Sequence, residues 1–303
     1  MQDKGIMQEQ THSPGWRLAK RVAARGVLTG RPCSLCGCVS GYRPMASQKS
    51  EWVLRLERLA AREGGFAYPW RSTIEEPHGE DAYTRLVLEH LRPELDVIEA
   101  GCGHGSDALE FAPRVRSYLG YDAVEPFIEI CRRRAAAASL DNTAFVVADS
   151  SRKRAGRVPA LDQSADLLIT RRGPTNPVLD ARRVCRPGAA LIGLYFVAPP
   201  LPQWNDMLPV EVRMTAEPSE LVSPKVLDYI ERGGLRMHGC WAFDVPEWFD
   251  DPEQLLLYIA WNRELEFDEQ RALDALGEVF AAHAIGGRVA LRHRRFLWKA
   301  MVD

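Results

Sequence analysis

Three glycines at alternate positions, Gly101, Gly103 and Gly105, mark the segment whose residue types and spacing could do chemistry. An apolar run that ends in Glu99 precedes them, and a helical pattern begins after them at Ser106. This order predicts a strand, a tight turn and a helix. Because glycine has no Cβ, the backbone of such a turn can approach a nucleotide-like ligand closely.

Two acidic residues follow at the ends of predicted strands. Residues 115–122 end in Asp122, and residues 143–149 form a third strand that ends in Asp149. The carboxyl ends of parallel strands meet at one edge of a sheet, where ligands of open α/β sheets bind. An ionised carboxylate at Asp122 can accept hydrogen bonds from both hydroxyls of a ribose. The spacing therefore places two acidic residues near the glycine turn.

Further predicted elements alternate in the order of an α/β protein. Strands are expected at 166–170 and 189–197, with a helix over 126–138 and another that ends at Pro187-Gly188. Beyond residue 198 the pattern predicts a helix ending at Arg232, helices over 255–262 and 268–283, and alternating strands over 235–244 and 287–300.

The E-x-G-x-G-x-G form of residues 99–105, followed by these strand ends, resembles the class I S-adenosylmethionine (SAM) methyltransferases. The resemblance covers about residues 90–198. It implies an α/β fold with a doubly wound seven-stranded sheet, mostly parallel with an antiparallel last strand, and here a helical cap. It implies SAM as the cofactor, with Asp149 accepting from the adenine amino group. The cofactor-binding residues expected on this basis are Glu99, Gly101, Cys102, Gly103, Gly105, Asp122, Ala123, Asp149 and Ser150.

The sixth position of the glycine turn separates SAM from a second candidate cofactor. A dinucleotide-binding turn has Gly or Ala at this position, whereas this chain has Ser106. NAD is therefore kept only as the alternative ligand.

Residues around the expected cofactor site are candidates for binding the methyl acceptor. In class I enzymes the segment before the first strand commonly forms a lid, so Trp70 and Arg71 are expected to line the pocket, although Trp70 could instead pin a helix to the core. Trp204 lies in an aromatic-rich region expected to cap the pocket. Such a cap suits a small or lipid-like acceptor, although core packing also explains such tryptophans.

Arg171 and Arg172 follow the fourth predicted strand. Methyltransferases that act on amino groups carry an Asn/Asp-Pro-Pro-aromatic turn there, so this sequence counts against an exocyclic amine as the acceptor. An arginine at this edge could clamp a carboxylate or a phosphate. We expect one of the two arginines, Arg171 in preference, to face the site and the other to form a structural ion pair.

No catalytic residue is assigned from the sequence. Methyl transfer requires alignment of the reacting groups and exclusion of water, and it needs a general base only when the acceptor is a weak acid. His78, His238 and Glu125 could accept a proton, but none has a neighbour in the sequence that would activate it.

Composition sets the outer bounds. The 303 residues are 46% hydrophobic and 26% charged, as in ordinary soluble enzymes, and the net charge of −2 gives no general attraction to nucleic acid. The sequence contains neither an 18-residue apolar run nor a signal-peptide pattern, so no membrane association is expected. Seven cysteines, an odd number, suit a reducing compartment, and a cytoplasmic location is the default expectation.

Residues 1–44 differ from the rest, with seven basic residues against two acidic ones. We expect a disordered basic arm or an upstream extension of a chain that starts naturally at Met45. Cys33, Cys36 and Cys38 lie in this arm, but a structural zinc ion usually takes two pairs of ligands, so no metal site is assigned.

The expected organisation beyond the arm has three parts. These are a helical lid over 45–90, a SAM-binding domain over 91–245 and 287–303, and a helical cap insertion over 246–286. The expected function is a SAM-dependent methyltransferase for a small, possibly anionic, acceptor. A ribosomal or transfer RNA methyltransferase, suggested by the basic arm, and a non-catalytic SAM-binding protein are the alternatives. The oligomeric state and the identity of the acceptor stay open.

Overall fold

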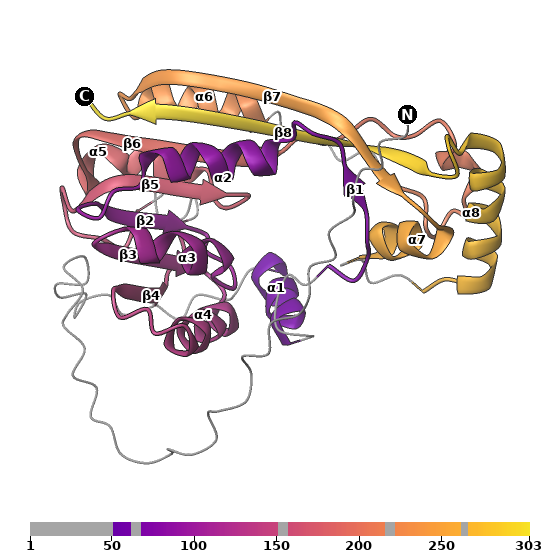
Figure 1. Cartoon of the computed structure of the whole chain (residues 1–303), viewed down its shortest axis with the longest axis horizontal. Coiled ribbons are helices and arrows are strands. Elements are labelled where there is room, and N and C mark those ends of the chain that lie inside the picture. The colour runs from indigo at the N-terminus through magenta and orange to yellow at the C-terminus, as the bar shows by residue number, and fades with distance from the viewer. Residues whose placement is uncertain (1–50, 62–67, 151–156, 216–221, 262–265) are drawn as a thin grey trace, which may run out of the picture. The chain divides into compact units, whose positions relative to one another are not determined.

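One mixed sheet of eight strands organises the chain (Figure 1). The computed structural model describes residues 51–61, 68–150, 157–215, 222–261 and 266–303, which all belong to one unit, Pro32–Asp303. The strand order is β1-β7-β8-β6-β5-β2-β3-β4. Five strands are mutually parallel: β2 (Asp96–Ala100), β3 (Ser117–Asp122), β4 (Thr143–Val147), β5 (Ala165–Arg171) and β6 (Cys185–Phe196). Strand β8 (Val289–Met301) runs antiparallel to both β6 and β7 (Arg236–Phe249).

The predicted doubly wound, mostly parallel sheet with an antiparallel last strand is therefore confirmed. The strand count differs by one, because the two-residue β1 (Thr73–Ile74) pairs antiparallel with Trp248 and Glu247 of β7. The helix before β6 ends at Val184, ahead of the Pro-Gly pair, and β6 begins at Cys185. Strand β7 also runs past the predicted 235–244 to Phe249.

Helices cover both faces of the sheet. One face packs against α2 (Gly79–His90), α3 (Ser106–Phe111) and α4 (Glu125–Ala137), and the other against η4 (Asn176–Asp180), α5 (Ala181–Val184) and α6 (Val222–Arg232). All five residues of β2 are buried, as expected of a central parallel strand. Val97 belongs to the apolar core between the sheet and α2, α3 and α4, whereas Ile98 belongs to the core on the opposite face, because successive side chains of a strand point to opposite faces.

A helical cap joins β7 to β8. The two strands continue as a hairpin whose last pair is Phe249 and Val289, and α7 (Pro252–Ala260) and α8 (Glu269–His283) follow between them (Figure 1). The side chains of Asp251 and Asp268 accept from backbone N–H groups and so cap the two helices. The cap has its own apolar core, formed by Trp204, Phe249, Leu255, Leu256, Leu276, Val279 and Leu291 among others.

Outside this cap, α1 (Glu51–Ala61) packs Val53, Leu59 and Ala60 against Phe127 and Ile130 of α4.

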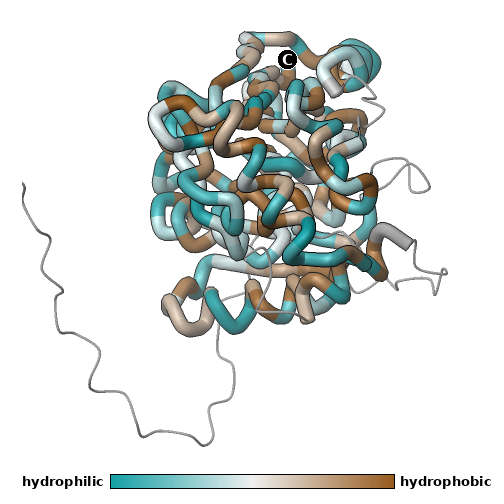
Figure 2. The backbone as a smooth tube through the Cα atoms, turned by 90° about the vertical axis from the view of Figure 1, so that its right-hand side faces the viewer, coloured by the Kyte–Doolittle hydropathy of each residue, from teal (hydrophilic) through white to brown (hydrophobic). Residues whose placement is uncertain are grey.

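Figure 2 shows that apolar and polar segments alternate along the described backbone. Within the described ranges, no helix has the length and apolar character required to cross a membrane.

Candidate functional site

The glycine turn connects β2 to α3 at the edge where the parallel strands end. Gly101, Gly103 and Gly105 have φ values of +74°, +50° and +80°, a region in which residues with a Cβ are strained. The N–H groups of Gly101 and Cys102 donate to the carbonyl of Tyr121 at 2.9 and 3.0 Å. The turn is thereby held against the end of β3.

A second turn, after β5, crosses directly over the first. A Cβ added to Gly101 would lie 2.6 Å from Cδ of Pro174 and 2.9 Å from Cα of Gly173. The Thr170 hydroxyl donates to the Ala100 carbonyl at 3.0 Å. The two turns can therefore approach this closely only because glycine stands at the contact.

Asp122 ends β3 beside the glycine turn. Its Oδ2 accepts from the Gly103 N–H at 3.0 Å and its Oδ1 accepts from the Val124 N–H at 2.9 Å. Burial raises the pKa of this carboxyl, and the backbone N–H groups act in the opposite direction. Each carboxylate oxygen can still accept a further hydrogen bond. The arrangement suits recognition of a pair of hydroxyls.

The end of β4 brings two more predicted residues to this edge. Strands β3 and β4 pair up to Asp122 and Val147, and the Ala148 N–H then donates to the Asp122 carbonyl at 2.8 Å. Asp149 is half-buried and Ser150 is buried, with the Ser150 hydroxyl 3.3 Å from that of Tyr121. The structure therefore places Asp149 and Ser150 next to Asp122, together with the half-buried Ala123.

Two predicted cofactor residues turn their side chains into the core. Glu99 is 3% exposed, and its Oε2 accepts from the Tyr118 hydroxyl at 2.8 Å. Burial, reinforced by the charge of Asp107, raises the pKa of Glu99 well above its usual range. Burial likewise raises the pKa of the Cys102 thiol. At both positions only the backbone faces the edge, so a ligand contact there would come from main-chain atoms.

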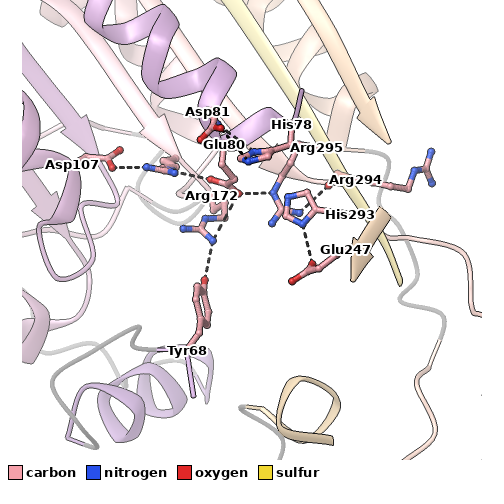
Figure 3. Close-up of polar contacts among 11 residues, drawn as sticks. Tyr68, His78, Glu80, Asp81, Asp107, Arg172, Glu247, His293, Arg294 and Arg295 are labelled. Carbon is pink, nitrogen blue, oxygen red and sulfur yellow. Dashed lines mark hydrogen bonds and ion pairs between the residues drawn. The ribbon is translucent and has the colours of Figure 1, made fainter. Parts of the chain in front are cut away.

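Arg171 lies between two carboxylates. Its Nε donates to Glu80 and its Nη1 donates to Asp107, both at 2.9 Å. Its side chain is 22% exposed, compared with 38% for Arg172. Arg172 donates to the Tyr68 hydroxyl at 2.8 Å and lies 3.9 Å from Glu80 (Figure 3). The structure thus gives Arg171 the structural ion pair and leaves Arg172 as the more accessible arginine, the reverse of the expected preference.

Glu80, in the first turn of α2, joins three arginines. Besides Arg171 and Arg172, it accepts from Nε of Arg295 on β8 at 2.6 Å (Figure 3). Burial alone would raise the pKa of Glu80, but the three guanidinium groups hold it at about 2. One carboxylate therefore links helix α2 to the end of β5 and the middle of β8.

The remaining acceptor-site candidates lie apart from this carboxylate. The Trp70 ring packs 4.6 Å from that of Tyr68 and 5.0 Å from that of Tyr258, measured between ring centroids. Arg71 is exposed, and its backbone N–H donates to the Gln254 side chain at 2.7 Å. Trp204 is 4% exposed within the cap core. Trp70 and Trp204 therefore serve the packing of the cap in this structure, and acceptor contacts of all three stay predictions.

Sequence reasoning missed the polar residues buried under the cap. His293 pairs with Glu247 and Arg295 pairs with Glu80 of α2, and the charge of Arg295 also acts on Glu247 (Figure 3). The available signal was the alternation of the last strand, in which His293 and Arg295 fall on the same face as Leu291 and Leu297. Polar residues at buried positions of a strand often mark a functional site.

Other conceivable proton acceptors are placed differently. His78 contacts Asp81, with Nε2 and Oδ2 3.2 Å apart, whereas His238 and Glu125 are exposed. The described residues contain no group of three or more His, Cys, Asp or Glu side chains suited to a metal ion. Cys33, Cys36 and Cys38 lie outside those residues, as does the whole of the predicted arm.

Comparison with known proteins agrees with this geometry. Residues 97–188 match a family model described as a methyltransferase domain. The matched region is thus similar to methyltransferase domains, in line with the expected resemblance to class I SAM-dependent methyltransferases. The matched region begins within β2 and ends in the first residues of β6, so it contains the glycine turn, Asp122 and Asp149.

Two curated relatives align with the methyltransferase region. The 2-heptyl-1-hydroxyquinolin-4(1H)-one methyltransferase of Mycobacteroides abscessus is 36% identical over 95 residues, which are 31% of this chain and 37% of the relative. The uncharacterised methyltransferase YcgJ of Bacillus subtilis is 29% identical over 114 residues, 38% of this chain and 43% of the relative. The chain thus spans less than half the length of either relative.

A solved structure shows the same fold over more of the chain. A protein of unknown function from Deinococcus radiodurans superposes with a TM-score of 0.57 at 19% identity, covering 84% of this chain and 100% of that protein. The likeness extends beyond the region that matches the family model and concerns the fold alone.

The crossing of the two turns predicts a large cost for a Cβ at Gly101. We expect Gly101→Ala to lower the free energy of unfolding by at least about 1 kcal/mol more than Gly188→Ala, because overpacking adds to the backbone strain. Gly188 is the matched control, since its φ is +82° but no atom lies within 4 Å of an added Cβ. Chemical denaturation measures both variants. Equal losses would mean that the turns do not pack as described.

The Glu80 cluster predicts a pH-dependent contribution to stability. Because the pKa of Glu80 falls from 4.5 to about 2, Glu80→Gln should cost about 3 kcal/mol at neutral pH. This contribution is complete above pH 4.5 and is lost as the pH falls towards about 2. The free energies of unfolding of the wild type and of Glu80→Gln, measured by chemical denaturation at each pH, should therefore converge over that range. Glu89→Gln, at an exposed position of the same helix, should change stability by less than about 0.5 kcal/mol. A constant difference across that range would contradict the ion-pair account.

Proposed function

We propose that the chain is a SAM-dependent methyltransferase that acts on a small acceptor molecule. The observation that carries the proposal is the contact between the Asp122 carboxylate and the Gly103 N–H, within a turn of three glycines that all have positive φ. This contact holds an acidic acceptor of hydrogen bonds against a turn in which every second residue is a glycine without a side chain. Both features suit a ligand with a ribose and an extended amino-acid tail.

The residues at this edge divide the binding of SAM among them. Asp122 is proposed to accept hydrogen bonds from the ribose hydroxyls, and Asp149 from the adenine amino group, with backbone contacts at Ala123 and Ser150. The glycine turn is proposed to follow the methionine part, with main-chain contacts at Glu99 and Cys102. When bound, SAM supplies a methyl group on a positively charged sulfur that is already electrophilic. The protein then has to orient the acceptor and exclude water.

Support for a small and anionic acceptor comes from the other end of the site. Arg172 is accessible at the carboxyl end of β5 and is held by Tyr68, so its guanidinium can pair with a carboxylate or a phosphate. The curated relative from Mycobacteroides abscessus is named for a small hydroxyquinolone. No observation on the described residues favours an RNA acceptor. A non-catalytic SAM-binding protein would share the cofactor site, and methyl transfer distinguishes it.

Titration calorimetry with SAM and S-adenosylhomocysteine (SAH) tests the cofactor site. We expect the full chain to bind both, and Asp122→Asn to weaken SAH binding by at least about tenfold, because hydrogen bonds to a charged group are each worth about 1.5–3 kcal/mol. Asp141→Asn, at an exposed position before β4, should leave affinity within about twofold.

Thermal unfolding of each variant verifies that it is folded. Wild-type affinity in Asp122→Asn would refute the assignment of the ribose site. If the folded wild-type chain bound NAD and failed to bind SAH, the alternative that the glycine turn binds a dinucleotide would be supported.

A further inference from the structure

A histidine and a carboxylate form a buried pair where β7 and β8 leave the main sheet. Nδ1 of His293 lies 3.0 Å from Oε2 of Glu247, and the two side chains are 5% and 7% exposed. The Ser72 hydroxyl donates to the other carboxylate oxygen, Oε1, at 2.7 Å. Glu247 thus has a partner for each oxygen, and His293 is held through a single nitrogen.

The second nitrogen of His293 has no such partner. Nε2 is buried and makes no hydrogen bond to any of the described residues. The ring of His78 is nearby, with centroids 6.2 Å apart, but both of its nitrogens contact Asp81. A buried polar atom without a partner is unfavourable and rare in folded proteins. Nε2 is therefore suited to a partner that is not part of these residues.

The position of His293 points to the acceptor side of the site. The last pair between β6 and β8 is Phe196 with Arg295, so His293 lies two residues beyond the carboxyl end of β6. Ligands of open α/β sheets bind beyond these strand ends. Arg295 also reaches Glu80, which pairs with Arg171. Figure 3 shows His293 and Glu247 beside this group of charged residues.

The charges around His293 favour one tautomer. Burial alone would raise the pKa of Glu247, but hydrogen bonds from His293 and Ser72 and the charge of Arg295 hold it below its usual value. An ionised Glu247 accepts the Nδ1–H proton and leaves a lone pair on Nε2. The other titratable groups near the pair are His78 and Tyr258. A carboxylate in this position also stabilises the imidazolium that forms when Nε2 gains a proton.

We propose that His293 Nε2 accepts the proton of a weakly acidic hydroxyl on the methyl acceptor, and that Glu247 is the positioning residue. The proposal rests on the proposed methyltransferase function and names its acceptor class, a small phenol-like or enol-like hydroxyl compound. The O–H bond breaks, its proton forms an N–H bond at Nε2, and the electron pair stays on the oxygen. That pair would form the new O–C bond as the S–C bond of SAM breaks, with the bonding electrons passing to sulfur and SAH as the leaving group. The imidazolium returns the proton to water.

Nitrogen NMR of the full chain, with ¹⁵N-labelled histidine and saturating SAH, tests the proton position directly. We expect His293 to carry its proton on Nδ1 at neutral pH, and the Nε2 resonance to shift when 2-naphthol is added. His293→Gln assigns the signal. A proton on Nε2, or an Nε2 resonance that 2-naphthol leaves unchanged, would overturn the proposal even if no acceptor were methylated.

Rates of methyl transfer to two acceptors of similar shape give a second readout. 2-Naphthol is a weak acid that needs a base, whereas 2-naphthalenethiol ionises more readily. We expect His293→Gln to lower kcat for the naphthol by about 100-fold or more and to change kcat for the thiol by less than about threefold. Glu247→Gln should give a smaller loss with the naphthol. The control His283→Gln, at an exposed position of α8, should change neither rate.

The pH profile separates a proton acceptor from a merely structural histidine. With 2-naphthol, the pH dependence of the wild-type rate should include a component that His293→Gln lacks. If His293→Gln lowered kcat equally for both acceptors and left the pH profile unchanged, His293 would contribute to packing and would not accept the proton. SAH affinity keeps the two proposals apart: loss of SAH binding in the wild-type chain refutes the methyltransferase, whereas intact binding with these negative results refutes only the role of His293.

Discussion

The close crossing of two turns at the carboxyl edge of the sheet is the constraint on which the rest of the site depends. Gly101 meets Gly173 and Pro174 with no room for a Cβ, so the turn after β2 and the turn after β5 fix each other. This contact sets where Gly103 presents its N–H to Asp122. It also determines where the chain leaves β5. Backbone geometry, rather than a set of reactive side chains, thus defines the proposed cofactor half of the site.

A chain of charges extends from this constraint to the cap. Asp107 of α3 pairs with Arg171, Arg171 with Glu80, and Glu80 with Arg295, two residues from His293. These residues come from α3, β5, α2 and β8, so the charges join elements that are distant in sequence. Buried ion pairs contribute little net stability, but removing one partner is costly. Such a chain of ion pairs therefore fixes the relative positions of the elements that carry it. It fixes the position of the glycine turn relative to the proposed acceptor side.

The sequence predicts the parts of the site that rest on local patterns. Glycines at alternate positions and an acidic residue at a strand end are enough to locate the turn and Asp122, because neighbouring residues along the chain determine both. Only the fold brings Glu80 and Asp107 to Arg171, so the sequence does not show which arginine forms these ion pairs, and which of the two faces the acceptor stays a prediction. The pairing of Glu247 with His293 depends on the register of β7 against β8, which alternation alone does not determine.

A crystal structure of the full chain grown with SAH would show the cofactor site directly. We expect the ribose hydroxyls to contact the Asp122 carboxylate, the amino-acid tail to follow the glycine turn, and the sulfur to point towards the side of the sheet edge where Arg172 and His293 lie. SAH bound elsewhere, or bound at the glycine turn with its ribose away from Asp122, would contradict the central claim that this turn and this carboxylate form the cofactor site.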